Sequence, residues 1–396
     1  MRRVAVIGGA ASPVGKLQTP ANAALQALEH ELLAPLVIEA MAAARLPKEE
    51  IGALVFAQCR PYTLQKYFAT FMANYLRLPL LGTIMEVLGN GMTGGMAFDQ
   101  AVNTITWGHA EVALALGINM ESQAATAEHA MTTMRATGDV DFHTIFGFTP
   151  IAWYAMDAVR YMHETGATRA QIASVAVKDR RHAALNPIAQ LRRPLSLDEV
   201  LAARPIVEPL GLYEVPPRGD GAVCLVVCSE DVAKATGQRY ALVRGRGFCH
   251  EGAHQINEAP GDMTAFPAAQ AAAAAAYSAA GITPAELDLA ELYAPCTIVQ
   301  VLVSEALGLA PRGQGAAHAA AGETALGGRI PICTSGGCLS RGHPPYVTGL
   351  LTIYELWEQL THRAGARQVR HARLGAASCE LGNYNAALVH VLEAVA

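Results

Sequence analysis

Several short stretches of the sequence carry side chains that could do acid–base chemistry. The stretch TSGGCLSRGHPPYVTG, residues 334 to 349, places His343 on a turn whose proline restricts the backbone before a predicted helix. An imidazole held in this way is suited to proton transfer or to hydrogen bonding with an oxyanion. Tyr346 follows three residues later. A structural loop histidine is the alternative interpretation of this pattern.

Two further stretches add a tyrosine and thiols. In ELYAPCTIVQVL, residues 291 to 302, a predicted strand ends with Tyr293 and Cys296 at a turn that contains proline. In ASCELGNYNAAL, residues 377 to 388, Cys379 precedes Gly382 in a short turn before the last predicted strand. A thiol beside free backbone N–H groups can have a lowered pKa and act as an acid, a base or a nucleophile. An ordinary buried aromatic and a buried structural cysteine are the alternatives.

A fourth stretch, MEVLGNGMTGGMAF at residues 85 to 98, predicts a strand that passes through a glycine-rich turn into an apolar helix. Such a sharp elbow is a usual position for a catalytic nucleophile. The candidate tip residues are Gly91, Met92 and Thr93, and only the threonine carries a hydroxyl. The sequence therefore predicts the shape of a nucleophile site without an obvious nucleophile.

A basic cluster lies in the middle of the chain, in the stretch KDRRHAALNPIAQLRRPLS. Its arginines could bind the phosphates of a ligand such as coenzyme A: Arg180, Arg181, Arg192 and Arg193. A solvated helix face explains the same cluster more simply.

The elements that must position these residues alternate between strands and helices. RVAVIG near the start, EVALALGI at 111 to 118, GAVCLVVC at 221 to 228 and AALVHVLE at 386 to 393 are continuous apolar runs of strand length. Such runs are typical of strands buried on both faces. LLAPLVIEAMAAARL and AAQAAAAAAYSAAG have the length and composition of helices. The predicted class is α/β, with sheets covered by helices.

Two stretches share one plan and predict a duplicated architecture. AAARLPKEEIGALVFAQC and YSAAGITPAELDLAELYAPC each contain a helix end, a proline, acidic residues and a strand, which runs to Cys59 or Cys296. Residues 119 to 210, between the two halves, are too long for a plain loop and predict an inserted subdomain. Its aromatic residues could line an apolar pocket or form its own core: Phe142, Phe146, Phe148, Trp153 and Tyr154.

Composition excludes some classes of function. The net charge of -5 and the pI near 6.2 argue against a nucleic-acid partner. The hydrophobic fraction of 52% suits a large buried core or an obligate oligomer. The N-terminal run VAVIGG is too short for a signal sequence or a membrane span. Eight cysteines without a CxxC pair predict reduced thiols and a cytoplasmic location.

Taken together, these stretches resemble the thiolase superfamily, and most of all its sterol-carrier-protein-type thiolases, over essentially the whole chain. The GHP turn supplies His343, the CELG turn places Cys379 at the family's second-thiol position, and RGDGAVCLVV is similar to its return strand. The resemblance implies duplicated βαβ halves in a five-layered α-β-α-β-α core. The N-terminal half would be residues 1–118 with a return strand at about 211–245, the loop and substrate subdomain 119–210, and the C-terminal half 246–396.

Two departures from the family change the expected chemistry. The family's nucleophilic cysteine falls on Gly91, which cannot be acylated, and Tyr293 stands where the family has histidine or asparagine. The elbow backbone at Gly91 and Met92 would then serve as an oxyanion site. Aldolases that cleave steroid side chains from a β-hydroxyacyl-CoA show the same loss of cysteine, and DRRHAALNP, VEPLGLYE and ELYAPCT resemble that branch. That branch replaces the GHP histidine with tyrosine, whereas this sequence keeps His343 and has Tyr346 nearby.

The resemblance implies a carbon–carbon lyase that acts on an acyl-CoA thioester. The expected reaction is retro-aldol cleavage of a β-hydroxyacyl-CoA with a steroid or aryl side chain, without a covalent acyl-cysteine. We assign enolate stabilisation to His343 with Tyr293 or a water, and proton transfer to Cys379 or Tyr293. The Gly91 region and the Gly382 turn would supply backbone donors.

The sequence leaves two other functions open, and the resemblance also implies partners for the chain. The chain could be a thiolase or acyltransferase whose nucleophile has moved to Cys296, Cys338 or Cys379, or a non-catalytic acyl-CoA-binding subunit. The resemblance implies a homodimer and a small OB-fold, zinc-ribbon subunit that helps to bind the acyl-CoA. Coenzyme A would enter as part of the substrate, with no covalent cofactor. No metal-ligand spacing occurs in the sequence, so any zinc would belong to the partner.

Overall fold

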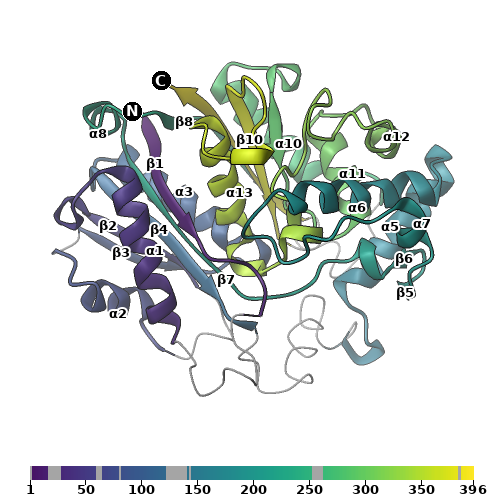
Figure 1. Ribbon diagram of the computed structural model, residues 1–396, viewed down its shortest axis with the longest axis horizontal. Coiled ribbons are helices and arrows are strands. Elements are labelled where there is room, and N and C mark those ends of the chain that lie inside the picture. The colour runs from purple at the N-terminus through teal and green to yellow at the C-terminus, as the bar shows by residue number, and fades with distance from the viewer. Residues whose placement is uncertain are drawn as a thin grey trace.

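The computed structural model of the chain describes residues 2–16, 28–58, 65–79, 82–121, 141, 144–251, 262–381 and 385–396. Its main feature is a nine-stranded mixed sheet (Figure 1). The strands lie in the order β3 (Thr83–Val87), β2 (Ala53–Ala57), β4 (Val112–Asn119), β7 (Gly221–Ser229), β1 (Val4–Ala11), β8 (Tyr240–His250), β11 (Ala386–Val395), β10 (Leu374–Glu380) and β9 (Leu289–Glu291). The predicted α/β class and the four predicted strands are confirmed.

The sheet consists of two halves that meet at a short junction. Strands β3 to β1 form the first half and β8 to β9 the second, and β1 pairs with β8 at Ala5–Leu242 and Val6–Ala241. Helices α3 (Thr93–Thr106) and α13 (Pro345–Leu360) pack against each other, and α13 contacts strands of both halves. Helix α1 (Glu29–Ala44) covers β1 and β7, while α10 (Pro267–Ala280) covers β8 and β11. This is the five-layered arrangement that the resemblance implied.

Small residues let the outer helices lie directly on the sheet. A Cβ atom at Gly245 or Gly247 of β8 would lie 2.1 or 1.9 Å from a carbonyl oxygen of α10. On the other half, a Cβ atom at Gly8 of β1 would lie 2.4 Å from the Ala40 carbonyl of α1. These contacts require glycine on the strands, and alanine on the helices keeps the spacing short. The alanine-rich composition of α10 therefore reflects close helix-to-sheet packing.

The duplicated plan seen in the sequence is present in the structure. After α1, a 3₁₀ turn (Lys48–Glu50) leads into β2, which is parallel to β3 and β4. After α10, a 3₁₀ turn (Pro284–Glu286) leads into β9, which is parallel to β10. The two stretches therefore occupy matching positions in the two halves.

The stretch predicted as an inserted subdomain contains helices and a small hairpin. Its elements are α5 (Pro150–Thr165), α6 (Arg169–Ala184), α7 (Leu197–Leu201), β5 (Pro205–Val207) and β6 (Leu210–Gly211). Figure 1 shows them grouped on the side of the molecule opposite α1. The chain returns through β7, which pairs with both β1 and β4. The predicted boundary at residue 246 lies inside β8, and the domain division stays a prediction.

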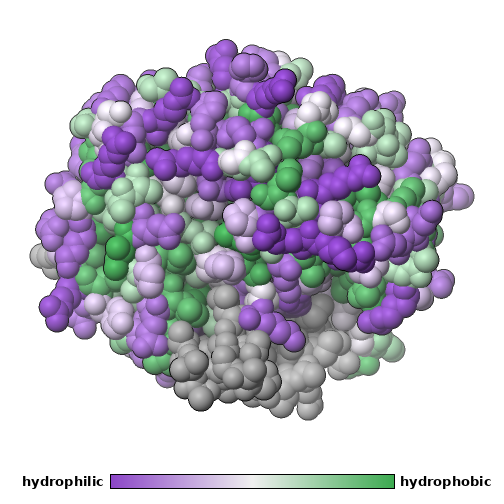
Figure 2. All heavy atoms as spheres, viewed as in Figure 1, coloured by the Kyte–Doolittle hydropathy of each residue, from purple (hydrophilic) through white to green (hydrophobic). Residues whose placement is uncertain are grey.

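In the described part of the chain, the remaining α-helices are α2 (Phe68–Tyr75), α8 (Glu230–Ala235), α11 (Thr297–Ala306) and α12 (Gly315–Ala320). Within the described ranges, no helix combines the length and apolar character needed to cross a membrane. Hydrophilic residues are spread over the face shown in Figure 2, with apolar residues between them.

Candidate active site

The predicted elbow is present: β3 leads through a 3₁₀ turn (Asn90–Met92) into α3. The Thr93 hydroxyl donates to the Asn90 carbonyl at 2.7 Å and accepts the Gly89 N–H at 2.9 Å. Thr93 is also fully buried, so its hydroxyl holds the turn together and is not presented as a nucleophile. The Met92 N–H is bonded to the Gly89 carbonyl at 2.9 Å, so this predicted oxyanion donor is already engaged.

Gly91, at the tip of the elbow, has no room for a side chain. A Cβ atom there would lie 2.7 Å from the Tyr293 hydroxyl oxygen and 2.6 Å from the Glu380 carbonyl oxygen. Real Cβ atoms essentially never approach other atoms so closely. The phenol of Tyr293 therefore occupies the space that a nucleophilic side chain at this position would need. Glycine at the tip and tyrosine on the opposite segment are sterically coupled.

Tyr293 and His343, predicted from separate stretches, meet in the structure. The Tyr293 hydroxyl lies 3.4 Å from His343 Nε2, and the two rings meet edge to face at 78°. Both side chains are buried. The Tyr293 N–H bonds the Ser378 carbonyl at 3.1 Å and continues the pairing of β9 with β10. The His343 N–H bonds the Pro217 carbonyl at 3.0 Å, just before α13 begins.

The neighbours of the imidazole decide which of its nitrogens carries the proton. The Thr348 hydroxyl lies 3.3 Å from His343 Nδ1 and donates its hydrogen to the Pro344 carbonyl at 2.8 Å. Because a hydroxyl has one hydrogen, Thr348 can only accept from Nδ1. Nδ1 therefore carries the proton of the neutral ring, and the Nε2 lone pair faces Tyr293. In this tautomer His343 accepts a proton and cannot donate one from Nε2 to an enolate.

Burial controls the charge of both groups. Burial, reinforced by the positive charges of Arg218 and Arg341, holds the pKa of His343 well below its ordinary value. Burial and the nearby Glu380 raise the pKa of Tyr293 well above its ordinary value. At neutral pH the pair is therefore a neutral imidazole beside an intact phenol, which is the arrangement a proton relay requires.

Cys379 lies beside Gly91, near the end of β10. Its Sγ donates to the Gly91 carbonyl at 3.2 Å. Cβ atoms placed on Gly95 and Gly349 would lie 3.2 and 2.8 Å from this sulfur, so the thiol sits where α3 and α13 are closest. Burial raises the pKa of Cys379. The side chain is therefore a protonated thiol, not a thiolate, at neutral pH.

The other two candidate nucleophiles are also buried thiols. Cys296 lies at the start of α11, and Cys338 lies in a π-helical turn (Gly337–Arg341). Burial raises the pKa of Cys296 well above its ordinary value and that of Cys338 to about 12. Since the thiolate is the nucleophilic form, neither environment favours an acyl-cysteine.

This arrangement predicts low thiol reactivity in the folded protein. At neutral pH, iodoacetamide should modify the half-buried Cys249 before Cys296, Cys338 or Cys379. Peptide mass spectrometry measures the order, and the chain unfolded in guanidinium provides the control in which all thiols react. Rapid stoichiometric labelling of one of the three buried thiols in the folded state would contradict the assignment.

The remaining residues predicted for the catalytic site are Tyr346 and Gly382. Tyr346 is buried in the first turn of α13, where its carbonyl oxygen would lie 3.2 Å from a Cβ atom on Gly94 of α3. It therefore lies at the contact between these two helices, and a catalytic role for it stays a prediction. Gly382 lies outside the described residues, as do Cys59 and Phe142.

The arginines predicted to bind coenzyme A fall into two environments. Arg180 is buried, and its guanidinium lies over the Tyr213 ring at 5.4 Å. The others are exposed: Arg181, Arg192 and Arg193. Arg193 pairs with Glu199 at 2.8 Å. Phosphate binding by this cluster stays a prediction.

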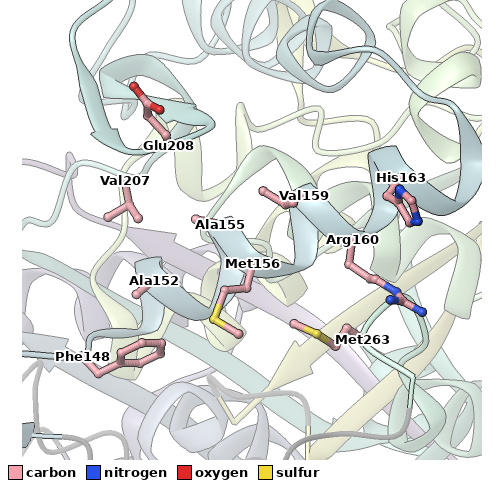
Figure 3. Close-up of a pocket in the computed structure, with 10 residues that line it drawn as sticks. All are labelled: Phe148, Ala152, Ala155, Met156, Val159, Arg160, His163, Val207, Glu208 and Met263. Carbon is pink, nitrogen blue, oxygen red and sulfur yellow. The ribbon is translucent and has the colours of Figure 1, made fainter. Parts of the chain in front are cut away.

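An apolar groove of about 500 Å³ runs along the outer face of α5 (Figure 3). Phe148, Met156 and Met263 line it, and Trp153 packs edge-on against Phe148. Tyr154 lies on the opposite, buried side of the helix. Among the described aromatic residues predicted for the insert, Phe148 thus lines a surface groove, Tyr154 lies in the core, and Phe146 is 76% exposed.

Two contacts around Tyr293 and His343 were not predicted from the sequence. Thr348 sets the tautomer of His343, and the Glu380 carbonyl closes the space at Gly91. Burial and the nearby Glu380 also raise the pKa of Tyr154, a second buried tyrosine in this region. A threonine five residues after histidine, at the start of a helix, was the one visible signal.

Comparison with known proteins gives matches along nearly the whole chain. Residues 4–231 match the thiolase N-terminal domain family, and residues 250–394 match the thiolase C-terminal domain-like family. The chain is 34% identical to the benzoylsuccinyl-CoA thiolase subunit BbsB of Thauera aromatica, over 72% of this chain and 73% of that protein. It is 35% identical to a steroid side-chain-cleaving aldolase of Thermomonospora curvata, over 52% of this chain and 53% of that protein.

Among solved structures, the chain is similar to the Ltp2-ChsH2(DUF35) aldolase. The TM-score is 0.84 at 27% sequence identity, and the alignment covers 99% of this chain and 98% of that chain. Similarity in fold and sequence therefore extends to proteins named for two different reactions, thiolysis and aldol cleavage.

Proposed function

The chain belongs to the thiolase superfamily, and from this premise we propose that it is a carbon–carbon lyase that cleaves a β-hydroxyacyl-CoA by a retro-aldol reaction. Its superfamily relatives include both aldolases and acetyltransferases. The observation that carries the proposal is the coupling at the elbow, where the Tyr293 hydroxyl lies 2.7 Å from the position of a Cβ atom on Gly91. A thiolase needs a nucleophile that can be acylated, whereas a retro-aldol reaction needs only proton transfer and enolate stabilisation.

The Tyr293–His343 pair supplies the base in this proposal. Tyr293 takes the proton of the β-hydroxyl group while its own proton passes to Nε2 of His343. The bond between the α and β carbons breaks, the β carbon becomes a ketone or aldehyde, and the electron pair moves onto the thioester as an enolate. Cys379, a buried thiol, protonates the α carbon. The proton on His343 later restores the thiol, so the products are a carbonyl compound and a shorter acyl-CoA.

The enolate oxygen has two proposed partners. In the neutral tautomer His343 presents a lone pair at Nε2, but after it takes the proton from Tyr293 the same nitrogen carries a hydrogen and can donate. The second proposed donor is the backbone N–H of Gly91. The neighbouring Met92 N–H is not proposed, because it already donates to the Gly89 carbonyl. Preorganised donors of this kind each contribute about 100- to 1000-fold in rate.

The relatives support an acyl-CoA with a bulky ring system as the substrate class. One is named for benzoylsuccinyl-CoA and another for the cleavage of steroid side chains. The thiolase relative keeps a second candidate open, which is an acyltransferase with a relocated cysteine. The raised pKa values of Cys296, Cys338 and Cys379 weigh against it. A non-catalytic acyl-CoA-binding subunit is the third candidate.

A partner subunit belongs to the proposal. The similar solved structure is named as an aldolase that pairs Ltp2 with ChsH2(DUF35), and BbsB is named as a subunit. We propose that this chain likewise works with a small acyl-CoA-binding subunit of the OB-fold, zinc-ribbon type.

We predict that two copies of the chain pair through β3, which lies at the edge of the sheet. Among the described strands β3 pairs with β2 alone, and Ile84 and Leu88 at this edge are 41% and 50% exposed. Because an unpaired apolar edge favours pairing with another strand, I84K should convert a homodimer into monomers. Size-exclusion chromatography with light scattering measures this, and I145K at another exposed isoleucine is the control. A monomeric wild type, or a dimeric I84K variant, would contradict the prediction.

Product analysis tests the proposed reaction. The protein, alone and with a co-expressed small subunit, is incubated with a panel of β-hydroxyacyl-CoA compounds in the absence of free coenzyme A. We expect a ketone or aldehyde and a shorter acyl-CoA in equal amounts by liquid chromatography and mass spectrometry. Binding without turnover across the panel would favour the non-catalytic subunit.

A further inference from the structure

Each member of the proposed relay follows a buried charged residue by two positions. Glu291, the last residue of β9, precedes Tyr293 and is fully buried. Arg341, the last residue of the π-helical turn, precedes His343 and is 1% exposed. Burying charged groups costs free energy unless they are paired and hydrogen-bonded. Because Glu291 and Arg341 each lie two positions before a relay residue, they are candidates for positioning that residue.

Ser335 joins these two residues. Its hydroxyl donates to Glu291 Oε2 at 2.7 Å, and its N–H donates to Glu291 Oε1 at 3.1 Å. The same hydroxyl accepts from Arg341 Nη1 at 3.2 Å. Arg341 Nη1 lies 4.0 Å from Glu291 Oε2. Burial and the charge of Glu355 raise the pKa of Glu291 to about 7, and the charge of Arg341 opposes this shift. We name this set, Glu291, Ser335 and Arg341, the buried bridge.

We propose that the buried bridge holds Tyr293 and His343 together, with Glu291 and Arg341 acting as positioning residues that do not touch the substrate. This inference rests on the proposed function, because it concerns the residues that position the Tyr293–His343 pair. The two relay residues lie on short supports. β9 has three residues, pairs with β10 on one side and has a single bridge, Ala290 to Ile332, on the other. His343 has a single bridge to Arg218 and follows Gly342, whose φ is 111°. A side-chain link between these supports sets the 3.4 Å separation of the relay.

The bridge is anchored to the helix that follows His343. The Thr334 hydroxyl lies 3.1 Å from Glu291 Oε1 and 2.9 Å from Glu355 Oε1 of α13. Arg367 Nε lies 2.9 Å from each Glu355 oxygen and compensates its charge. A chain of buried polar contacts thus runs from the end of β9 to the middle of α13. Movement of one support would break several contacts at once, which makes the separation stiff.

The first arm of the test uses R341M, which keeps much of the side-chain volume and removes the charge and the donors. With the chain in its active assembly, we expect kcat to fall about 10- to 100-fold with little change in KM, since a misplacement of about 1 Å can cost about 100-fold. R244M is the matched control, because Arg244 pairs with Glu393 at 2.6 Å between β8 and β11. That variant should keep its kcat.

A double-mutant cycle separates positioning from a general structural role. If Arg341 acts through Tyr293, adding R341M to Y293F should lower kcat by less than about twofold, because coupled residues are not additive. Additive losses would overturn the inference. If R341M does not fold, S335A takes its place in both arms, because it removes only the hydroxyl that joins Glu291 to Arg341.

A crystal structure of R341M, or of S335A in its place, gives a readout that does not depend on turnover. We expect the distance between the Tyr293 hydroxyl and His343 Nε2 to exceed hydrogen-bonding distance in this variant. In R244M the same distance should remain 3.4 Å. An unchanged contact in the bridge variant would overturn the inference even if activity fell. If no β-hydroxyacyl-CoA is cleaved by the wild type, the proposed function fails, and the crystal structures alone decide on the bridge.

Discussion

Y293F is expected to lower kcat on a β-hydroxyacyl-CoA by about 100- to 10,000-fold, the range that a positioned acid–base group contributes. The change removes the hydroxyl 3.4 Å from His343 Nε2 and leaves the aromatic ring in its edge-to-face packing. KM should change little, because the phenol acts on the reacting proton. H343N should cause a loss of similar size, and the Y293F/H343N double variant should be little worse than either single one, since both belong to one relay.

Steady-state kinetics measures kcat and KM, and thermal unfolding shows whether each variant is folded. Y277F is the control, because the Tyr277 hydroxyl is also buried and donates to the Leu307 carbonyl at 2.9 Å away from the relay. It should keep its kcat while Y293F does not. The pKa of His343 lies well below 6.5, so the acid limb of the wild-type pH profile should lie below that pH. A Y293F variant with nearly full activity would remove Tyr293 from the mechanism.

G91A carries the second large expected effect. The added Cβ would lie 2.6 Å from the Glu380 carbonyl oxygen, which is backbone, and 2.7 Å from the Tyr293 hydroxyl. One of them must move, so we expect kcat to fall by about 100-fold through displacement of the relay. Overpacking of this kind should also lower the free energy of unfolding by about 1–3 kcal/mol.

Kinetics and denaturant unfolding of G91A measure both effects, with G211A as the control. The nearest atom to a Cβ on Gly211 is a guanidinium nitrogen of Arg169 at 3.2 Å, which is the end of a flexible side chain. G91C should likewise fail to restore a thiolase, because Tyr293 still fills the space that the cysteine needs. Full activity of G91A, or acylation of the thiol introduced by G91C with Tyr293 unmoved, would contradict the steric coupling.

The fold could be predicted largely from local patterns. Buried strands are continuous apolar runs, and all four predicted strands pair within one sheet. The repeated plan of helix end, turn and strand predicted the two halves, because β2 and β9 follow the same kind of turn. The elbow at Gly91 was visible because glycine clusters mark a sharp turn between a strand and a helix.

The site could be predicted only where a residue type carried the chemistry by itself. His343, Tyr293 and Cys379 were predicted in this way, and their catalytic roles stay predictions. Their arrangement depends on contacts between distant segments, such as the 50 positions between Tyr293 and His343. The tautomer set by Thr348 and the buried bridge needed the structure for the same reason. The arginine cluster looked like one group in the sequence, but its members lie in two environments. Arg180 is buried against the Tyr213 ring, whereas Arg181 beside it is exposed.

The most direct test is the intact mass of the protein during turnover of a β-hydroxyacyl-CoA, with and without free coenzyme A. If the reaction is a retro-aldol cleavage, we expect release of a carbonyl compound and a shorter acyl-CoA, no dependence on free coenzyme A, and no increase in the mass of the protein. A protein that gains the mass of an acyl group on a cysteine, and that turns over only with free coenzyme A, would contradict it.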